Sequence, residues 1–144
     1  MTQASTRTDA ADVEAVIAAR NRAISAKDAA AVAACQAPGA VSFNLAPPLV
    51  ADDVGGLQDW FDSWDGPIGL ELRDLKVAAS GDVAFAHALA HMTGRRTYGE
   101  TSDVWFRLTL GLTRGPGGWK IVHEHESTPF YMDGSLKAAV DLKP

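Results

Sequence analysis

The sequence is poor in cysteine and has no long apolar run. Its 144 residues include one cysteine, Cys35. No disulfide can therefore form within the chain, and a lone thiol is typical of a reducing compartment. No segment reaches the roughly 18 apolar residues of a membrane-spanning helix, and the first residues lack the apolar core of a secretion signal. We therefore expect a cytoplasmic protein without a membrane segment.

An excess of positive charge is also absent. Lys and Arg together number 13, against 18 Asp and Glu, which gives a net charge of −5. Nucleic acids and anionic membranes are bound by clustered Lys and Arg. The one local basic cluster is Arg95-Arg96, which we place in a turn. The composition therefore argues against a nucleic-acid or membrane partner.

Several motifs of catalysis are missing. The sequence contains no GxSxG, no CxxC and no Gly-rich phosphate loop, which disfavours acyl transfer, dithiol chemistry and nucleotide hydrolysis. The four histidines fall in two same-face pairs on predicted strands, His87 with His91 and His123 with His125. A further strand separates the pairs by roughly 9 to 10 Å, so one metal ion does not bridge them. We expect neither a metal nor a cofactor.

The chain is long enough for one hydrophobic core, since 47% of its residues are apolar. No repeat or linker interrupts it, so residues 1–144 are predicted to form a single domain. Apolar spacing with capping residues predicts helices, and alternation bounded by Gly or Pro predicts strands. We expect helices over 9–24, 28–35 and 52–64, strands over 41–45, 70–79, 83–93, 101–114 and 119–128, and a segment over 129–144 that is either an irregular tail or forms a short helix at 135–142.

This order of elements predicts the fold class. Helices followed by an antiparallel meander are typical of an α+β domain, in which the N-terminal helices pack over the concave face of a curved antiparallel sheet. A slip in the alternation at Asp74 predicts a β-bulge. A one-sided run of Ala84, Ala86, Ala88 and Ala90 predicts a closely packed layer. Such a curved sheet leaves space for a pocket beneath the helices.

The last predicted strand carries the most ionisable side chains. Alternate residues point to opposite faces of a sheet, so the side chains of this strand form two sets. One face carries Ile121, His123, His125 and Ser127. The other face carries Val122, Glu124 and Glu126. Imidazole, or a carboxylate in an apolar pocket, can transfer protons near neutral pH. The pattern does not choose which face lines the pocket, and a solvated face with hydrogen-bonded histidines is the structural alternative.

Two arginines are placed ambiguously by the sequence. Arg20 falls on the apolar face of the first helix, where its charge either reaches solvent at the helix edge or enters a cavity that the helix covers. Arg107 lies on the long strand, opposite His125 or Glu126 depending on the length of the hairpin loop. In either register Arg107 meets an ionisable partner.

The order of elements and the ending from Gly118-Trp119 to Phe130 resemble the nuclear transport factor 2-like superfamily. Within it, this turn and the motif His123-x-His125-x-Ser127 are similar to SnoaL-like and ketosteroid-isomerase-related proteins, and to the association domain of calcium/calmodulin-dependent kinase II. The resemblance implies a cone-shaped, cystatin-like α+β fold with a cavity, and commonly a homodimer formed through the outer sheet face. Members isomerise, dehydrate, cyclise, hydrolyse epoxides or do not catalyse.

The catalytic pattern of ketosteroid isomerase is not matched residue by residue. Its base falls at about Asn44, which cannot accept a proton near neutral pH. Its tyrosine falls near Arg20 or Asn21, and its second acid falls near Leu110. Steroid isomerisation by that mechanism is therefore not expected.

We expect an apolar small molecule as the partner, held in a pocket that supports isomerase, lyase or cyclase chemistry by proton transfer. Glu124 or, failing that, His125 is the predicted proton-transfer group. The predicted pocket residues are Arg20, Asn44, Trp60, Trp64, Trp105, Arg107 and His123. A non-catalytic binding or oligomerisation module is one alternative, and water activation of the epoxide-hydrolase type is another.

Overall fold

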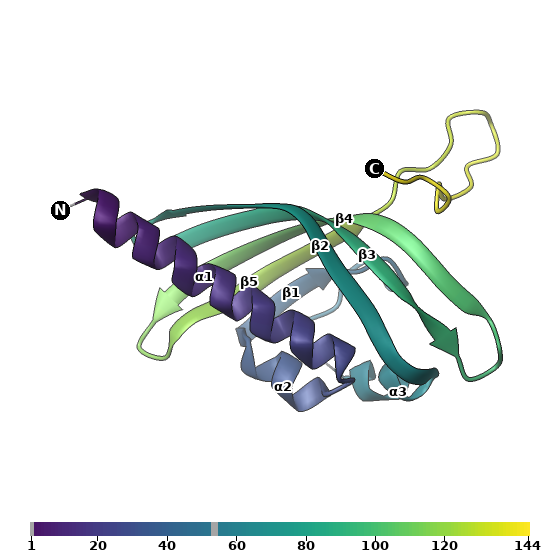
Figure 1. Cartoon of the computed structure of the whole chain (residues 1–144), viewed down its shortest axis with the longest axis horizontal. Helices are drawn as coiled ribbons and strands as arrows, with labels where there is room; N and C mark the ends of the chain where they lie inside the picture. The colour runs from purple at the N-terminus through teal and green to yellow at the C-terminus, as the bar shows by residue number, and fades with distance from the viewer. Residues whose placement is uncertain (1, 53–54) are drawn as a thin grey trace.

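Helices and strands of the computed structural model follow the predicted order (Figure 1). The structure describes residues 2–52 and 55–144. None of the described helices is both long and apolar enough to span a membrane. The elements are α1 (Thr2–Ser25), α2 (Ala29–Ala34), β1 (Gln36–Phe43), α3 (Leu57–Asp62), β2 (Trp64–Ser80), β3 (Val83–Arg96), β4 (Thr101–Gly115) and β5 (Gly118–Ser127).

The strands form one five-stranded sheet in the order β1-β5-β4-β3-β2. Strands β2 to β5 make the predicted antiparallel meander, and the α+β fold class is confirmed. Strand β1 differs from the expected all-antiparallel sheet, because it pairs in parallel with β5. The reason lies in α2, whose last turn leads the chain to the beginning of β5, where Ile121 donates a backbone hydrogen bond to the carbonyl of Cys35.

Some element boundaries differ from the sequence prediction. Helix α3 is shorter than expected and is capped by Gly56 rather than by Asp52; the alternative cap, Asp53, lies outside the described residues. Trp64 therefore opens β2 instead of ending a helix. Asp28 caps α2 as predicted, accepting a hydrogen bond from the Ala31 amide at 3.0 Å.

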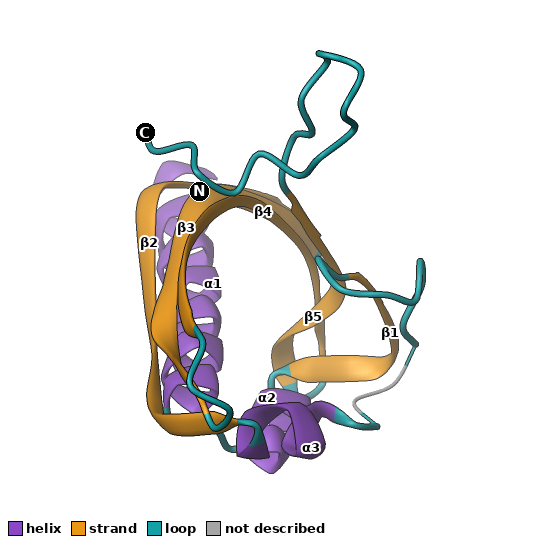
Figure 2. Cartoon of the chain, turned by 90° about the vertical axis from the view of Figure 1, so that its right-hand side faces the viewer, coloured by secondary structure: helices purple, strands orange, loops and turns teal. Residues whose placement is uncertain are grey.

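The predicted helix at 135–142 is wrong. The tail after β5 consists of turns, with an isolated bridge between Phe130 and Ala138. The Asp133 carboxylate accepts from the Ser135 amide, and the Ser135 hydroxyl accepts from the Lys137 amide. Such local side-chain bonds offer the backbone an alternative to helix formation. Figures 1 and 2 show the tail projecting away from the sheet.

The core lies between α1 and the inner face of the sheet. Val13 and Ile17 of α1 are fully buried, and the predicted alanine layer of β3 gives the helix room to approach. A second apolar cluster surrounds Phe61 and Trp64 at the other end of the molecule, where α2 and α3 lie. The buried inner face of the sheet consists mainly of Ala84, Ala86, Ala88, Ala90, Phe106, Leu108, Leu110, Leu112 and Ile121.

β-Bulges accompany the curvature of the sheet, which Figure 2 shows wrapping around the interior. The bulge predicted at Asp74 is confirmed, because the β2–β3 register shifts there and Asp74 adopts a φ of 58°. A second bulge, not predicted, lies between β4 and β5. Ile121 pairs with Leu112 but His123 pairs with Gly111, so Val122 is an extra residue. Bulges bend a strand and re-aim the side chains that follow.

Candidate functional site

A cavity of about 430 Å³ lies between the helices and the inner face of the sheet. Apolar side chains from β2, β3 and β4 make up much of its wall, and the residues after β1 contribute a further part. Polar groups concentrate in two regions. One contains Arg20, Asn44, Glu124 and Glu126, and the other contains Arg96 beside Trp60 and Trp64. This combination of an apolar wall with few polar groups is typical of a small-molecule site.

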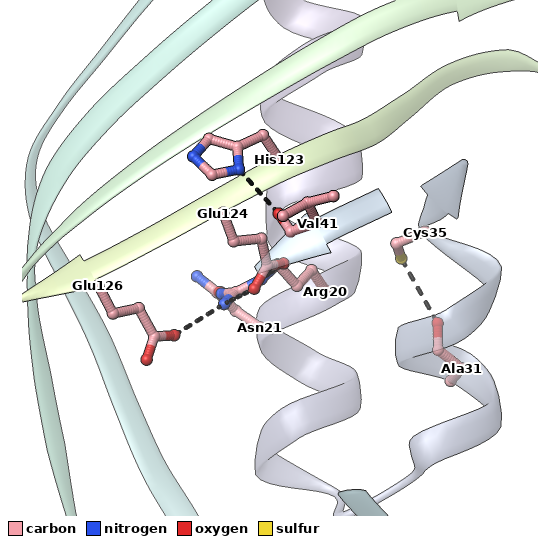
Figure 3. A network of polar contacts seen from close by, with 8 residues as sticks. All are labelled: Arg20, Asn21, Ala31, Cys35, Val41, His123, Glu124 and Glu126. Carbon is pink, nitrogen blue, oxygen red and sulfur yellow. Dashed lines mark hydrogen bonds and ion pairs between the residues drawn. The ribbon is translucent and has the colours of Figure 1, made fainter. Parts of the chain in front are cut away.

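Arg20 and Glu124 form the centre of the first region (Figure 3). Arg20 Nε donates to Glu124 Oε1 at 2.7 Å, and Nη2 donates to Oε2 at 3.1 Å. Both residues are buried, with 3% and 6% of their surfaces exposed. Two parallel bonds between a guanidinium and a carboxylate are strong and fix both groups in orientation.

The Arg20 guanidinium stays protonated in this setting. Burial by itself would lower the pKa of Arg20, but the charge and hydrogen bonds of Glu124, together with the charge of Glu126, raise it. Arg20 Nη1 also donates to Asn21 Oδ1 at 3.1 Å. The positive charge of Arg20 on the apolar face of α1 is therefore stabilised by the carboxylates of β5 and not by solvent. Of the two sequence interpretations of Arg20, the structure supports the cavity.

Glu126 is the less restrained of the two carboxylates. Its Oε1 accepts one long bond of 3.4 Å from Arg20 Nη2, and its side chain is 18% exposed. Burial raises the pKa of Glu126 and the nearby Glu124 charge adds to that shift. The Arg20 charge and hydrogen bonds from the Leu45 backbone and Arg20 oppose it, and the pKa stays above its usual value. A carboxyl group with a raised pKa is suited to general acid–base work near neutral pH.

The histidines of β5 lie on the other face of the sheet. In Figure 3 the His123 ring is on the opposite side of the β5 ribbon from Glu124. Its Nδ1 is 2.8 Å from the Val41 carbonyl, which can only accept, so Nδ1 is the donor. The Phe43 ring meets His123 and His125 edge to face, at centroid distances of 4.7 and 5.4 Å. His123 and His125 are thus packed against β1 and do not line the cavity.

Trp105 and Arg107 also lie on this outer face. Trp105 stacks on His91 at 4.4 Å, and the Arg73 guanidinium sits 4.6 Å from its ring centre. Arg107 pairs with Ser127 across the ladder and donates to its hydroxyl at 3.1 Å. The expected partner of Arg107 was His125 or Glu126. Both expected partners are wrong. Between the turn and the bulge the pairing follows the register that would place Glu126 opposite Arg107, and the extra residue Val122 then brings Ser127 there instead.

The predicted site residues are therefore divided between two faces. Glu124, Arg20, Asn44, Trp60 and Trp64 line the cavity. The structure places the other predicted residues outside the cavity lining, and these are His125, Trp105, Arg107 and His123. The bulge is the physical reason for the division on β5, since it turns Glu124 to the same side as Ile121, whereas regular alternation would have turned the histidines inward.

The second region of the cavity was missed by the sequence analysis, which placed Arg96 in a turn. Strand β3 continues to Arg96, whose backbone pairs with Trp64 of β2. The Arg96 guanidinium lies 4.6 Å from the Trp64 ring centre and donates through Nη2 to the Ser63 hydroxyl at 2.6 Å. A signal was present in the sequence, because alternation from Met92 through Gly94 to Arg96 continues the inner face of the strand.

The described residues contain no group of three His, Cys, Asp or Glu side chains arranged to hold a metal ion. The chemistry available at the site is that of its carboxylates, guanidinium groups, amide and indoles. Cys35 lies near Arg20 in Figure 3, but its thiol donates to the Ala31 carbonyl at 3.5 Å and burial raises its pKa. A raised pKa keeps a cysteine in its unreactive thiol form.

The family model of the SnoaL-like domain matches residues 13–131. Comparison with curated proteins finds no match. Among solved structures, an NTF2-like protein of unknown function from Pseudomonas putida KT2440 is 29% identical with a TM-score of 0.86, and the alignment covers 96% of this chain and 99% of that chain.

Two further structures share the fold at lower identity. A candidate dehydratase of the NTF2-like family from Streptomyces avermitilis is 18% identical with a TM-score of 0.74, over 85% of this chain and 97% of that chain. The association domain of the C. elegans kinase CaMKII is 20% identical with a TM-score of 0.69, over 86% and 98%. The nuclear transport factor 2-like resemblance of the sequence is confirmed.

Proposed function

Because the chain belongs to the SnoaL-like domain family, we propose that its cavity binds a small apolar molecule with a carbonyl-type group, on which Glu126 transfers a proton. The reaction class is isomerisation, elimination or cyclisation, each of which requires a proton to leave or reach a carbon or oxygen of the ligand. The name of the S. avermitilis relative, a candidate dehydratase, is compatible with this class.

One observation carries the proposal, namely the unequal engagement of the two carboxylates by Arg20. Both oxygens of Glu124 are bound by the guanidinium, so this carboxylate is held in place as the partner of Arg20. Glu126 has a single long bond to the same group and a raised pKa. We therefore assign the proton transfer to Glu126 and give Glu124 the role of holding Arg20.

The surroundings of Glu126 favour a neutral apolar ligand. Leu45, Phe106 and Leu108 line the cavity, and Leu108 pairs directly with Glu126 across β4 and β5. Asn44 lines the same part of the cavity and offers an amide donor for a carbonyl oxygen. A polarised carbonyl beside a carboxylate is the arrangement needed to remove an α-proton.

The experiment uses 2-tetralone, an apolar ketone with acidic α-protons, incubated with the protein in D₂O. We expect protein-dependent deuterium incorporation at the α-carbon, followed by NMR, and a loss of about 10²- to 10⁴-fold in Glu126→Gln. A shift of the melting temperature by the ketone reports binding separately. Exchange that is unchanged in Glu126→Gln would remove the proposed role of this carboxylate, and binding without exchange would favour a non-catalytic pocket.

Activation of water is a second candidate reaction, favoured by the neighbours of Glu126. Ser42 and Asn44 line the cavity together with Glu126, so a water molecule there would meet both a carboxylate acceptor and polar side chains. A carboxylate with a raised pKa can accept a proton from such a water as the water oxygen attacks an epoxide carbon. The epoxide C–O bond at that carbon breaks, and the alkoxide that forms takes a proton from solvent to give the diol. Styrene oxide is the probe, and diol formation that is lost in Glu126→Gln is the expected result for this reaction.

We also propose that two copies associate through the outer face of the sheet. Val83 and Phe85 of β3 are exposed by 61% and 54%, and both lie on the face opposite the buried alanines. Exposed apolar side chains that cluster on a sheet mark an interaction surface. The similarity to a kinase association domain supports this proposal at the level of the fold.

A further inference from the structure

Among the described residues, three buried side-chain nitrogens lack a hydrogen-bond partner: Trp64 Nε1, Arg96 Nε and Trp119 Nε1. The first two belong to residues that line the cavity. A buried donor without an acceptor is unfavourable, and two such donors in one part of a cavity point to an acceptor supplied by a ligand.

The two donors are held close to one another by the sheet. Trp64 and Arg96 are partners across β2 and β3, and the Arg96 guanidinium lies over the Trp64 indole at 4.6 Å from its centre. A Cβ atom on Gly94 would lie 2.8 Å from Trp64 Cε3 and Cζ3. The benzene edge of the indole therefore packs against Gly94, which leaves the Nε1 edge directed away from β3.

Arg96 is the charged residue of the cavity lining in this region, since the other charged lining residues are Arg20, Glu124 and Glu126 of the first region. Arg96 makes no ion pair with any residue that the structure describes, whereas Arg20 is engaged by two carboxylates. Lys27 Nζ donates to the Trp64 carbonyl at 3.0 Å and brings a second cation. An anionic acceptor is thus favoured over a neutral one. A carboxylate offers two acceptor oxygens, one for the Arg96 guanidinium and one for the Trp64 indole N–H, and the contact between these two side chains brings both donors to one place.

We propose that Trp64 and Arg96 bind the carboxylate of an elongated, flat apolar acid, whose other end lies beside Glu126. This inference rests on the proposed function and names its substrate class. The separation of the two regions follows from β4, where Ser102 pairs with Gly94 and Leu108 pairs with Glu126. These two positions of β4 are six residues apart, so a ligand that reaches both regions is elongated along the strand.

The cavity wall between the two regions suits the body of such an acid. Leu70, Met92 and Phe106 line it, and the Trp60 ring meets Trp64 edge to face at a centroid distance of 5.5 Å. Aromatic and thioether side chains pack well against flat apolar surfaces. The carboxylate thus anchors one end of the substrate, and the reacting carbonyl at the other end is delivered to the proton-transfer group.

The test compares two probes of the same shape, biphenyl-4-carboxylate and biphenyl-4-carboxamide, by titration calorimetry at pH 8. We expect the wild-type protein to bind the carboxylate at least about tenfold more tightly, and Arg96→Gln and Trp64→Phe each to remove about tenfold of that preference. Arg96→Lys keeps the charge and loses the planar fork, so an intermediate affinity is expected. Arg95→Gln removes the same charge from the exposed neighbouring residue and is expected to leave both affinities unchanged.

The outcomes separate this inference from the proposed function. A carboxylate preference that survives in both Arg96→Gln and Trp64→Phe would overturn the inference, and so would equal binding of the two probes. Failure of both biphenyls while 2-tetralone still binds and exchanges would overturn the inference and leave the proposed function intact. If Trp64→Phe does not fold, the test rests on the comparison of Arg96→Gln with the wild type, because Arg96 is only half-buried. Circular dichroism then shows whether Arg96→Gln is folded.

Discussion

Arg20 of α1 and Glu124 of β5 are 104 residues apart in the sequence, yet they share two hydrogen bonds in the interior. This pair joins the first helix to the last strand. Because both groups are buried, each depends on the other to offset the loss of its hydration. The pair therefore contributes to the structure of the cavity as well as to its charge.

Glu124→Gln is expected to lower the free energy of unfolding by about 3 kcal/mol, since breaking a buried pair leaves an uncompensated charge and Glu126 replaces the partner only in part. Replacing both partners, in Arg20→Met with Glu124→Leu, is expected to cost less than the sum of the single changes. Urea denaturation of the wild type, the single variants Arg20→Met and Glu124→Leu and the double variant gives the coupling free energy between the two side chains. Additive effects would contradict a buried pair, and Asp82→Asn, in an exposed pair with Arg114, is the control with little effect.

Glu126 is expected to make stability depend on pH. Its pKa is raised in the folded state, so the folded protein holds the proton more tightly than the unfolded chain does. The stabilisation from protonation is full below the ordinary glutamate pKa and is lost as the pH rises through the folded pKa. Glu126→Gln should therefore be more stable than wild type at pH 8 and similar at pH 4, measured by thermal unfolding. A constant difference across this range would show that the pKa of Glu126 is not raised.

Gly94→Ala is expected to destabilise the protein by about 1 to 3 kcal/mol, because the new methyl group would lie 2.8 Å from the Trp64 ring and overpacking carries this cost. A displaced indole also shifts the tryptophan fluorescence. Gly115→Ala adds the same methyl group where no atom lies within 4 Å and is the matched control. Equal stability of the two variants would mean that Trp64 does not pack against Gly94.

Phe85→Ser is expected to shift the protein toward the monomer if the outer sheet face joins two copies, since it removes an exposed aromatic side chain from that face. Analytical ultracentrifugation over a range of concentrations measures the shift. Leu49→Ser removes an apolar side chain that is 93% exposed in a loop and should leave the association unchanged. If Phe85→Ser dimerises as strongly as the wild type, the interface does not include this part of the outer sheet face.

Much of the fold could be predicted from the sequence because its signals are local. Asp28 as a helix cap, the alanine layer of β3 and the bulge at Asp74 all follow from patterns within a few residues. The parallel pairing of β1 with β5 could not be predicted in this way. It depends on where the end of α2 lies relative to β5, and this position is set by contacts distant in sequence, such as the hydrogen bond between Cys35 and Ile121.

The candidate site was predicted only in part, for a different physical reason. Arg20 and Asn44 were predicted as pocket residues and Glu124 as the proton-transfer group, and all three line the cavity. Which face of β5 lines the cavity depends on one bulge that was not predicted. The role proposed for Glu126 depends on how Arg20 divides its hydrogen bonds between the two carboxylates. Arg96 was missed because Gly94 looked like a turn residue, whereas its missing side chain makes room for Trp64.

The extra residue at Val122 has a broader consequence for what this strand can encode. Strand β5 carries two interleaved sets of acid–base groups, carboxylates and imidazoles, one residue out of phase with each other. The bulge determines which set the interior receives, while the other set is kept on the outer face. A change in phase at this point would exchange carboxylate for imidazole chemistry in the cavity without any change to the residues that perform it. A related protein whose β5 lacks this extra residue would therefore direct His123 and His125 into the cavity.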